Sequence, residues 1–268
     1  MFAGANWSQV IQRLRCAGVY DALMFFPRAR ARILFVLIVV IAAGDKLQNA
    51  QSAPASALSS TQIVEQIQVH DQVRARTLKH YSSTRHYAVE YRGFPTDLSA
   101  AMDVEASFDA ATGKSFRIVS QSGSKFLADK VLKRAVDSEK EASLDKGSTA
   151  LTPANYKFTL LKSETLGSGP AYIFDLEPLH PSKFLYRGRI WVDATDFAVV
   201  KMETQPSKSP SFWISKTLIE STSGKTGDFW FPQKLRSETK VRIGGGAVLT
   251  IDYGTYEVSP ATKTGLTH

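Results

Sequence analysis

Residues 184–214, FLYRGRIWVDATDFAVVKMETQPSKSPSFWI, carry the pattern that decides the fold. Two strand-like runs, residues 184–193 and 197–204, flank the short polar turn Ala194-Thr195-Asp196. In the first run the residues of an apolar face alternate with those of a mixed face, which is typical of an antiparallel strand with one buried side. The stretch therefore predicts a β-hairpin within a larger sheet.

The same alternation recurs along most of the chain, between short turns, and predicts an antiparallel meander. Two segments, residues 61–80 and 124–142, instead place apolar residues at helical spacing. Because strands and helices do not alternate, the pattern indicates one α+β domain dominated by a large curved antiparallel sheet. Further strands are expected at residues 84–94, 101–108, 115–120, 155–161, 171–176, 212–220, 227–240 and 247–258.

The second helical segment interrupts the series of strands. Ser124 can cap its start, and the polar loop 144–153 that follows is long enough to move. We expect this helix and loop to form a lid over the concave face of the sheet.

The N-terminal region has the features of an export signal. Arg28, Arg30 and Arg32 precede an apolar run of 11 residues, 33–43, and the motif Ala55-Ser56-Ala57 follows it. A run this short is well below the roughly 20 residues that span a bilayer, which favours a cleaved signal over a permanent membrane helix.

This interpretation divides the chain into a signal peptide with an N-terminal extension, residues 1–57, and a single domain, residues 58–268, with Met24 as an alternative start. Cys16 is the only cysteine and precedes the apolar run, so the exported part has no disulfide, no cysteine-based metal site and no lipid-anchor cysteine. Its 27 Lys and Arg against 23 Asp and Glu give a mild charge of +4, and no basic run with interleaved aromatics indicates nucleic-acid binding. Export to a bacterial periplasm fits these features best.

The sequence offers little that indicates catalysis or metal binding. The five histidines have no metal-ligand spacing, and Gly244-Gly245-Gly246 precedes a strand rather than the helix that a phosphate loop requires. No nucleophile elbow is present, and the carboxylate pair Asp103 and Glu105 is the common case of like charges on a solvated strand face. We therefore expect no catalytic residue, no metal and no cofactor, and hence no enzyme.

What the chain has in excess is apolar surface on one face of nearly every strand. Such a face normally forms a packed core, but a curved sheet of about ten strands can also enclose a cavity for an apolar ligand. The sequence by itself leaves both possibilities open.

Five segments carry a family resemblance: LYRGRIWVDATDFAVVKMETQPSKSPSFWI, GDFWFP, LTIDYGTYEV, HYAVEYRGF and GSKFLADKVLKRAVDSEKEA. Together with the first helical segment, they resemble the outer-membrane lipoprotein-sorting proteins, the LolA/LolB-like family of diderm bacteria. The resemblance implies a half-open β-barrel, capped by helices, whose apolar cavity takes acyl chains. It also implies binding and transfer rather than catalysis.

On this resemblance we expect a monomeric periplasmic carrier that binds an acylated lipoprotein or phospholipid and moves it from an inner-membrane donor to an outer-membrane acceptor. The lid is expected near Phe126, Leu127 and Val131. The expected ligand-binding residues are those on the apolar, inward face of the strands: Tyr87, Val89, Tyr91, Met102, Val104, Phe116, Ile118, Phe174, Ile190 and Val192.

Two other functions stay open at this point. The same fold can serve an envelope stress sensor or regulatory subunit that binds a protein partner, with Trp191, Trp213 and Trp230 forming an exposed contact patch or else packing in the core. A hydrolase is disfavoured because no nucleophile and base are arranged together.

Overall fold

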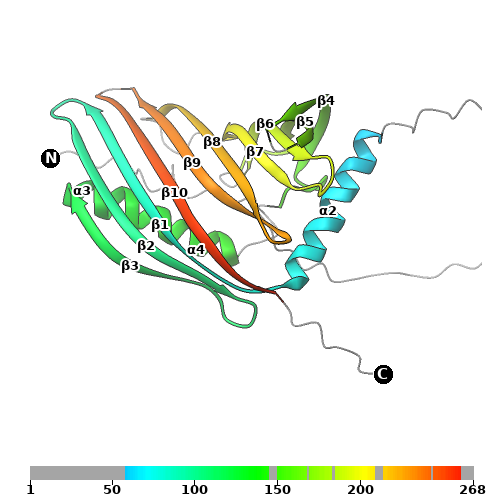
Figure 1. The fold of residues 1–268 in the computed structure, drawn as a ribbon. Coiled ribbons are helices and arrows are strands. Elements are labelled where there is room, and N and C mark those ends of the chain that lie inside the picture. The colour runs from blue at the N-terminus through cyan, green and yellow to red at the C-terminus, as the bar shows by residue number, and fades with distance from the viewer. Residues whose placement is uncertain are drawn as a thin grey trace, which may run out of the picture.

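The computed structural model describes residues 58–144, 150–167, 169–182, 185–208, 214–242 and 244–260, so the predicted signal peptide lies outside the described residues. Ten strands form one antiparallel sheet in the order β3-β2-β1-β10-β9-β8-β7-β6-β5-β4 (Figure 1). The strands are β1 (Leu78–Gly93), β2 (Leu98–Asp109), β3 (Gly113–Gly123), β4 (Tyr156–Leu166), β5 (Gly169–Pro178), β6 (Tyr186–Asp193), β7 (Val199–Pro206), β8 (Ile214–Thr226), β9 (Phe229–Val241) and β10 (Gly245–Pro260).

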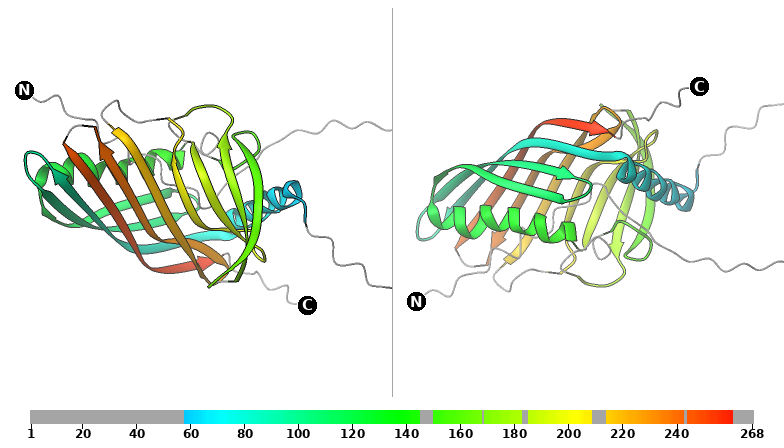
Figure 2. Two further views of the ribbon diagram at one scale, coloured as in Figure 1. Left: turned by 90° about the horizontal axis from the view of Figure 1, so that it is seen from above. Right: turned by 90° about the horizontal axis from the view of Figure 1, so that it is seen from below.

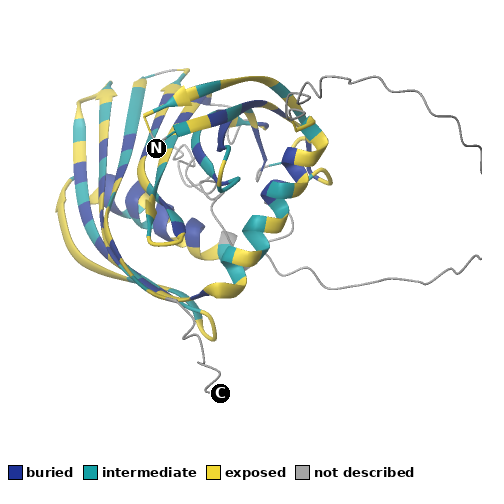
Figure 3. Cartoon of the chain, turned by 45° about the vertical axis from the view of Figure 1, so that its right-hand side comes forward, coloured by how far each residue is buried: buried dark blue, intermediate teal, exposed yellow. Residues whose placement is uncertain are grey.

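The sheet curves round an interior but does not close, because β3 and β4 are its two edges (Figures 2 and 3). Register shifts interrupt several strand pairs, for example between Ser83 and Arg85 in β1 and between Thr222 and Ser223 in β8. Such bulges bend a strand and increase its twist, which helps a long sheet to curl. The predicted fold class, a large curved antiparallel sheet that is half open and covered by helices, is confirmed.

The hairpin that decided the prediction is formed by β6 and β7. The carboxylate Oδ1 of Asp193 accepts hydrogen bonds from the backbone N–H groups of Thr195 at 2.9 Å and Asp196 at 2.7 Å, which fixes the turn between the strands. Phe197 then adopts a positive φ of 51° before the chain enters β7. The short polar turn predicted from the sequence is therefore present.

Helix α2 (Ser60–Thr77) covers the β4–β6 end of the sheet. Ser59 caps it through a reciprocal pair of bonds with Gln62, which satisfies N–H groups that the first turn leaves free. The predicted helix end at His80 is wrong. The chain enters β1 directly at Leu78, because this side chain is buried in a cluster of strand residues rather than on the helix.

The predicted lid helix consists of three consecutive pieces: α3 (Lys125–Leu127), η1 (Ala128–Leu132) and α4 (Lys133–Leu144). The side-chain oxygen of Ser124 accepts a hydrogen bond from the backbone N–H of Leu127, as the sequence predicted for this cap. The helix lies across the concave side of β1–β3 (Figure 1), and part of the loop predicted after it lies outside the described residues. None of the described helices combines the length and apolarity needed to cross a bilayer.

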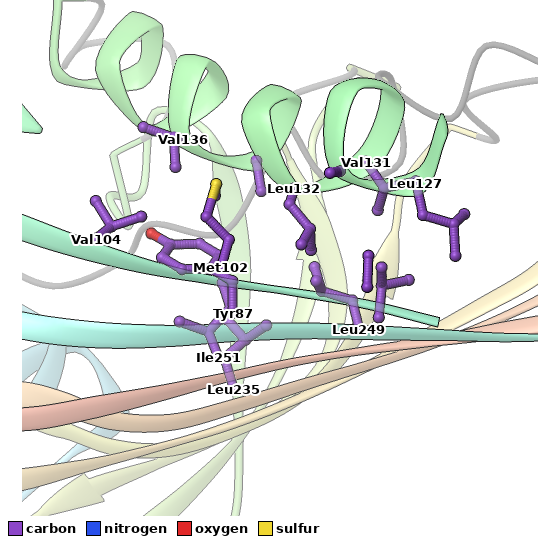
Figure 4. Close-up of a cluster of buried hydrophobic side chains, with 14 of the residues drawn as sticks. Tyr87, Met102, Val104, Leu127, Val131, Leu132, Val136, Leu235, Leu249 and Ile251 are labelled. Carbon is purple, nitrogen blue, oxygen red and sulfur yellow. The ribbon is translucent and has the colours of Figure 1, made fainter. Parts of the chain in front are cut away.

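Two separate apolar clusters fill the interior of the curved sheet, on either side of the cleft described below. The first cluster joins the lid helix to β1, β2, β9 and β10, and Figure 4 shows side chains of the helix and the sheet pointing toward one another. The second cluster joins α2 to β4, β5 and β6. The buried members of the first cluster include Tyr87, Val89, Met102, Val104, Leu127, Val131, Leu132, Leu235, Leu249 and Ile251; those of the second include Ile63, Ile67, Tyr156, Phe174, Leu176, Leu185, Ile190 and Val192.

Candidate functional site

A cleft lies between α4 and the inner faces of β1, β3 and β6–β10, where the two apolar clusters approach each other. Its cavity volume is about 70 Å³, and the space reaches about 800 Å³ only when open solvent at its mouth is counted. The cavity is thus smaller than the roughly 300–1,000 Å³ of pockets that enclose a drug-sized ligand, so a long chain needs the cleft to widen. The residues that line it are Tyr81, Arg85, Lys114, Glu139, Tyr186, Val199, Met202, Thr204, Ile219, Ser221, Ser223, Phe231, Pro232, Leu235, Tyr253 and Tyr256.

The cleft exists because several inward positions in the middle of the sheet carry small side chains. Thr204 of β7 and Ser221 and Ser223 of β8 line the cleft where bulkier residues would fill it. Nearby, Thr217 of β8 and Thr239 of β9 are buried with their hydroxyl oxygens 3.2 Å apart. A sheet of this curvature needs large inward side chains to be filled, and these positions carry small ones.

One wall of the cleft is apolar. It includes Val199, Met202, Ile219, Phe231 and Leu235, which come from three neighbouring strands. Apolar walls with a few polar groups at one end are the usual arrangement of sites for amphipathic small molecules. An alkyl chain placed along this wall would bury methylene groups without needing a polar partner.

The other end of the cleft carries charged groups. Nη1 of Arg85 in β1 donates a hydrogen bond to Oε1 of Glu139 in α4 at 2.7 Å, and these side chains are only 2% and 9% exposed. Nζ of Lys114 in β3 lies 3.9 Å from the same carboxylate oxygen. The ion pair therefore connects the sheet to the lid helix at the rim of the cleft.

Aromatic rings surround the Arg85 guanidinium. Its central carbon lies 5.0 Å from the ring centroid of Tyr253 and 5.5 Å from that of Phe116, distances at which a cation is attracted to the ring face. Burial lowers the pKa of Arg85, but the Glu139 carboxylate and the neighbouring tyrosines together raise it well above its ordinary value. For the Tyr253 hydroxyl, burial raises the pKa, so this group stays protonated and neutral.

Most of the predicted cavity residues lie in the two packed clusters rather than along the cleft. Tyr87, Val89, Met102 and Val104 pack against Leu127 and Val131 of the lid helix in the first cluster, whereas Phe174, Ile190 and Val192 lie in the second. The structure thus brings the predicted residues together as two groups. Their role in binding a ligand stays a prediction.

The remaining predicted residues are less buried. Tyr91 is partly buried, and its hydroxyl donates to the Phe94 carbonyl at 2.7 Å. Ile118 is opposite Val104, on the same face, but is 40% exposed because β3 is an edge strand with no neighbour beyond it. Phe126 is 51% exposed at the start of the lid helix and does not cover the cleft. Phe116 is partly buried beside the first cluster.

The sequence analysis missed the charged residues of the cleft, although signals for Arg85 and Glu139 were present. Arg85 has the same period-two phase as Tyr87 and Val89, so an inward arginine follows from the alternation of β1. Glu139 also had a signal, because it is spaced three, four and seven residues from Val136, Ala135 and Leu132 and so falls on the buried face of the lid helix. Only the crossing of helix and sheet brings the two groups together.

The predicted tryptophan patch is not an exposed surface in the part of the chain that the structure describes. Trp191 faces away from Ile190, as predicted, but is buried with Ile173 and Val200, and its ring N–H donates to Glu164 at 2.7 Å. Trp230 is partly buried and donates to Asp196 at 2.9 Å. Trp213 lies outside the described residues.

The carboxylates considered for acid–base chemistry bond to neighbouring strands. Asp103 accepts hydrogen bonds from Ser120 at 2.6 Å and contacts the His86 ring at 2.7 Å, and these bonds lower the pKa of Asp103. Glu105 accepts a hydrogen bond from Arg117 at 3.1 Å. All lie on an exposed strand face. Among the described residues, no group of three or more His, Cys, Asp or Glu side chains could hold a metal ion.

No family model and no curated protein matches the chain. Solved structures do match it. A DUF1329 family protein from Desulfovibrio piger is 15% identical with a TM-score of 0.41, covering 76% of this chain and 93% of that chain. A putative outer membrane lipoprotein-sorting protein domain from Vibrio parahaemolyticus is 10% identical with a TM-score of 0.38, covering 76% and 94%.

A LolA superfamily protein from Nitrosomonas europaea is 11% identical with a TM-score of 0.32, covering 79% of this chain and 99% of that chain. The descriptions of the Vibrio and Nitrosomonas proteins, a lipoprotein-sorting protein domain and a LolA superfamily protein, name the family that the sequence resembles. Because all three TM-scores are below 0.5, we base the proposed function on the cleft and not on these likenesses.

Proposed function

We propose that this protein is a periplasmic carrier that binds the acyl chain of a lipid or lipoprotein in the cleft and moves it toward the outer membrane without catalysing a reaction. One observation carries the proposal: the interior of the curved sheet contains a cleft with an apolar wall between two packed clusters. Apolar ligands bind in such a cleft because water leaves both surfaces.

The apolar wall can supply the affinity for an alkyl chain once the cleft has widened. Each methylene group moved from water into the cleft contributes about 0.8 kcal/mol, so a chain of ~10 carbons gains about 8 kcal/mol before the cost of immobilisation is subtracted. Hydrophobic burial is not directional, so the site needs no catalytic group to retain a chain. Release to an acceptor then requires that the cleft opens or that the acceptor offers a more apolar surface.

The lid helix is the element that can control access. It packs on the sheet through one apolar cluster, and Arg85 and Glu139 form the contact between sheet and helix next to the cleft. Rearrangement of this helix would widen the cleft while the strands stay paired. We propose that the predicted signal peptide delivers the domain to the periplasm as a soluble monomer between donor and acceptor membranes.

A matched pair of tryptophan substitutions tests the proposal. Ser221→Trp places a large ring in the cleft, whereas Thr222→Trp places the same ring on the opposite, exposed face of β8. We expect Ser221→Trp to lower the affinity for a lysophospholipid with one short acyl chain by about tenfold or more, because the ring occupies the apolar space. Thr222→Trp should bind as the unaltered protein does.

Titration calorimetry measures both affinities, and circular dichroism confirms that both variants keep their strand content. Equal binding by the two variants would contradict the assignment of the cleft as the acyl-chain site. Absence of lipid binding in the unaltered protein would contradict the carrier function as a whole.

A further inference from the structure

The charged end of the cleft has more positive than negative groups. Among the residues that line the cleft, Arg85 and Lys114 are cationic and Glu139 is the one carboxylate. Net charge beside an apolar wall is costly because the surroundings solvate it poorly. A bound anion would offset this cost, whereas a bound cation would increase it.

The Arg85 guanidinium has a donor that Glu139 does not use. Nη1 donates to Glu139 at 2.7 Å, but Nε is buried and has no hydrogen-bond acceptor among the described residues. The N–H groups of an arginine lie in one plane and match the oxygens of a carboxylate or a phosphate. The buried Nε–H is thus a ready donor beside the cleft that Arg85 lines.

Lys114 supplies a second cation at the same end. Its side chain is 16% exposed, and its ammonium lies 5.9 Å from the ring centroid of Tyr81. The distance of 3.9 Å to Glu139 is beyond a hydrogen bond, so this contact leaves the ammonium N–H groups able to reach another anion. Two cations from two strands therefore face one end of an otherwise apolar cleft.

We propose that the cleft selects single-chain amphiphiles with an anionic head, a carboxylate or a phosphate. The head binds between Arg85 and Lys114, and the alkyl chain lies along the wall that includes Met202 and Ile219. This inference rests on the proposed function and adds the chemical class of the ligand. A bare anion would use the charged end but not the wall, and a neutral lipid would use the wall but not the charged end.

Four ligands separate these cases in titration calorimetry of the exported protein: decanoate, decyl phosphate, decanol and acetate. Decanoate and decanol share one alkyl chain and differ in the charge of the head. We expect decanoate and decyl phosphate to bind about tenfold or more tightly than decanol, since a charged hydrogen bond to Arg85 adds to the chain term. Acetate, which has the head without the chain, should give no measurable binding.

Variants assign the preference to the named residues. Lys114→Met keeps the Arg85–Glu139 ion pair, so the fold and the lid contact are retained. We expect it to reduce the advantage of decanoate severalfold while decanol binds unchanged. The double variant Arg85→Met/Glu139→Gln, which removes both members of the pair, should abolish the rest. Lys162→Met, at a lysine that is 63% exposed and is not among the residues lining the cleft, is the matched control and should change nothing.

The outcomes that overturn this inference differ from those that overturn the carrier function. Equal affinity for decanoate and decanol would show that the head group is not selected, with the acyl-chain site still standing. Binding of acetate as tight as that of decanoate would show a small-anion site that makes no use of the wall. Failure of every alkyl ligand to bind would overturn the carrier function and this inference together.

Discussion

Arg85 and Glu139 show how much of the site depends on single side chains. A buried ion pair is balanced between attraction and loss of hydration, so removing one member leaves the other charge without compensation. Here the remaining charge would be that of Arg85, inside a cage of aromatic rings. The pair therefore stabilises one arrangement of the lid helix on the sheet more than it stabilises the fold as a whole.

The first prediction concerns this pair. Glu139→Gln should lower the free energy of unfolding by about 3–5 kcal/mol, because Arg85 stays buried without a counter-charge. The double variant Arg85→Met/Glu139→Gln should recover most of the loss, since both charges are removed. Urea unfolding followed by circular dichroism measures these differences.

Glu203→Gln is the matched control for this measurement. Glu203 pairs with Arg189 at 2.8 Å, but the arginine is 54% exposed, so the loss should stay within about 1 kcal/mol. If Glu139→Gln costs no more than Glu203→Gln, the pair does not hold the lid helix on the sheet.

At the residue scale, the sequence predicted which face of a strand a side chain occupies better than it predicted what packs against that face. Alternation placed Tyr87 and Val89 inward and Trp191 on the opposite face from Ile190, and the structure agrees. It did not decide whether Trp191 is exposed or buried, and the structure buries it in a small apolar cluster on the face opposite the main interior. What covers a given face depends on residues that lie far away in the sequence.

Among the elements, the lid helix has the clearest division of faces. Leu132 is fully buried between helix and sheet, whereas Phe126, six residues earlier, projects into solvent. The η1 turn ends at Leu132, with the Lys133 backbone N–H bonded to the Ala128 carbonyl. Such wide turns are rare and frequent at functional sites, which agrees with a helix that adjusts its position.

The second prediction compares these two faces. Leu132→Ala should lower the free energy of unfolding by about 2–5 kcal/mol, because it leaves a cavity in the first apolar cluster. Phe126→Ala should cost less than about 1 kcal/mol, because this ring already contacts water. Thermal or urea unfolding of the two variants checks the expectation. Similar losses in both would mean that the helix does not pack on the sheet as described.

Two elements show which structural features the sequence pattern could predict and which it could not. The β6–β7 hairpin was predictable because its alternation and its Asp-containing turn are local features. The end of α2 was not, because Leu78 continues the apolar stripe of the helix in sequence yet belongs to a strand cluster in space. Helix and strand patterns overlap for a residue or two at such junctions, and tertiary packing decides between them.

For the whole molecule, the one-faced strands were enough to predict a large curved antiparallel sheet. They were not enough to predict the cleft, because the volume inside a curved sheet depends on which inward side chains meet across it. The small residues of β7 and β8 and the charged pair at the lid lie on elements that are distant in sequence. Most of the residues that the sequence suggested as ligand contacts belong to the two packed clusters, and their role in binding stays a prediction.

Whether the cleft is occupied in the cell tests the central claim most directly. The full chain would be expressed in a diderm bacterium, and the exported protein would be examined by native mass spectrometry followed by lipid extraction. The account predicts a lipid or acylated protein bound at close to one molecule per chain, and its loss in Ser221→Trp but not in Thr222→Trp. An empty protein that takes up no added lipid, or one that returns a single stoichiometric protein partner and no lipid, would contradict the carrier function and favour a partner-binding regulator.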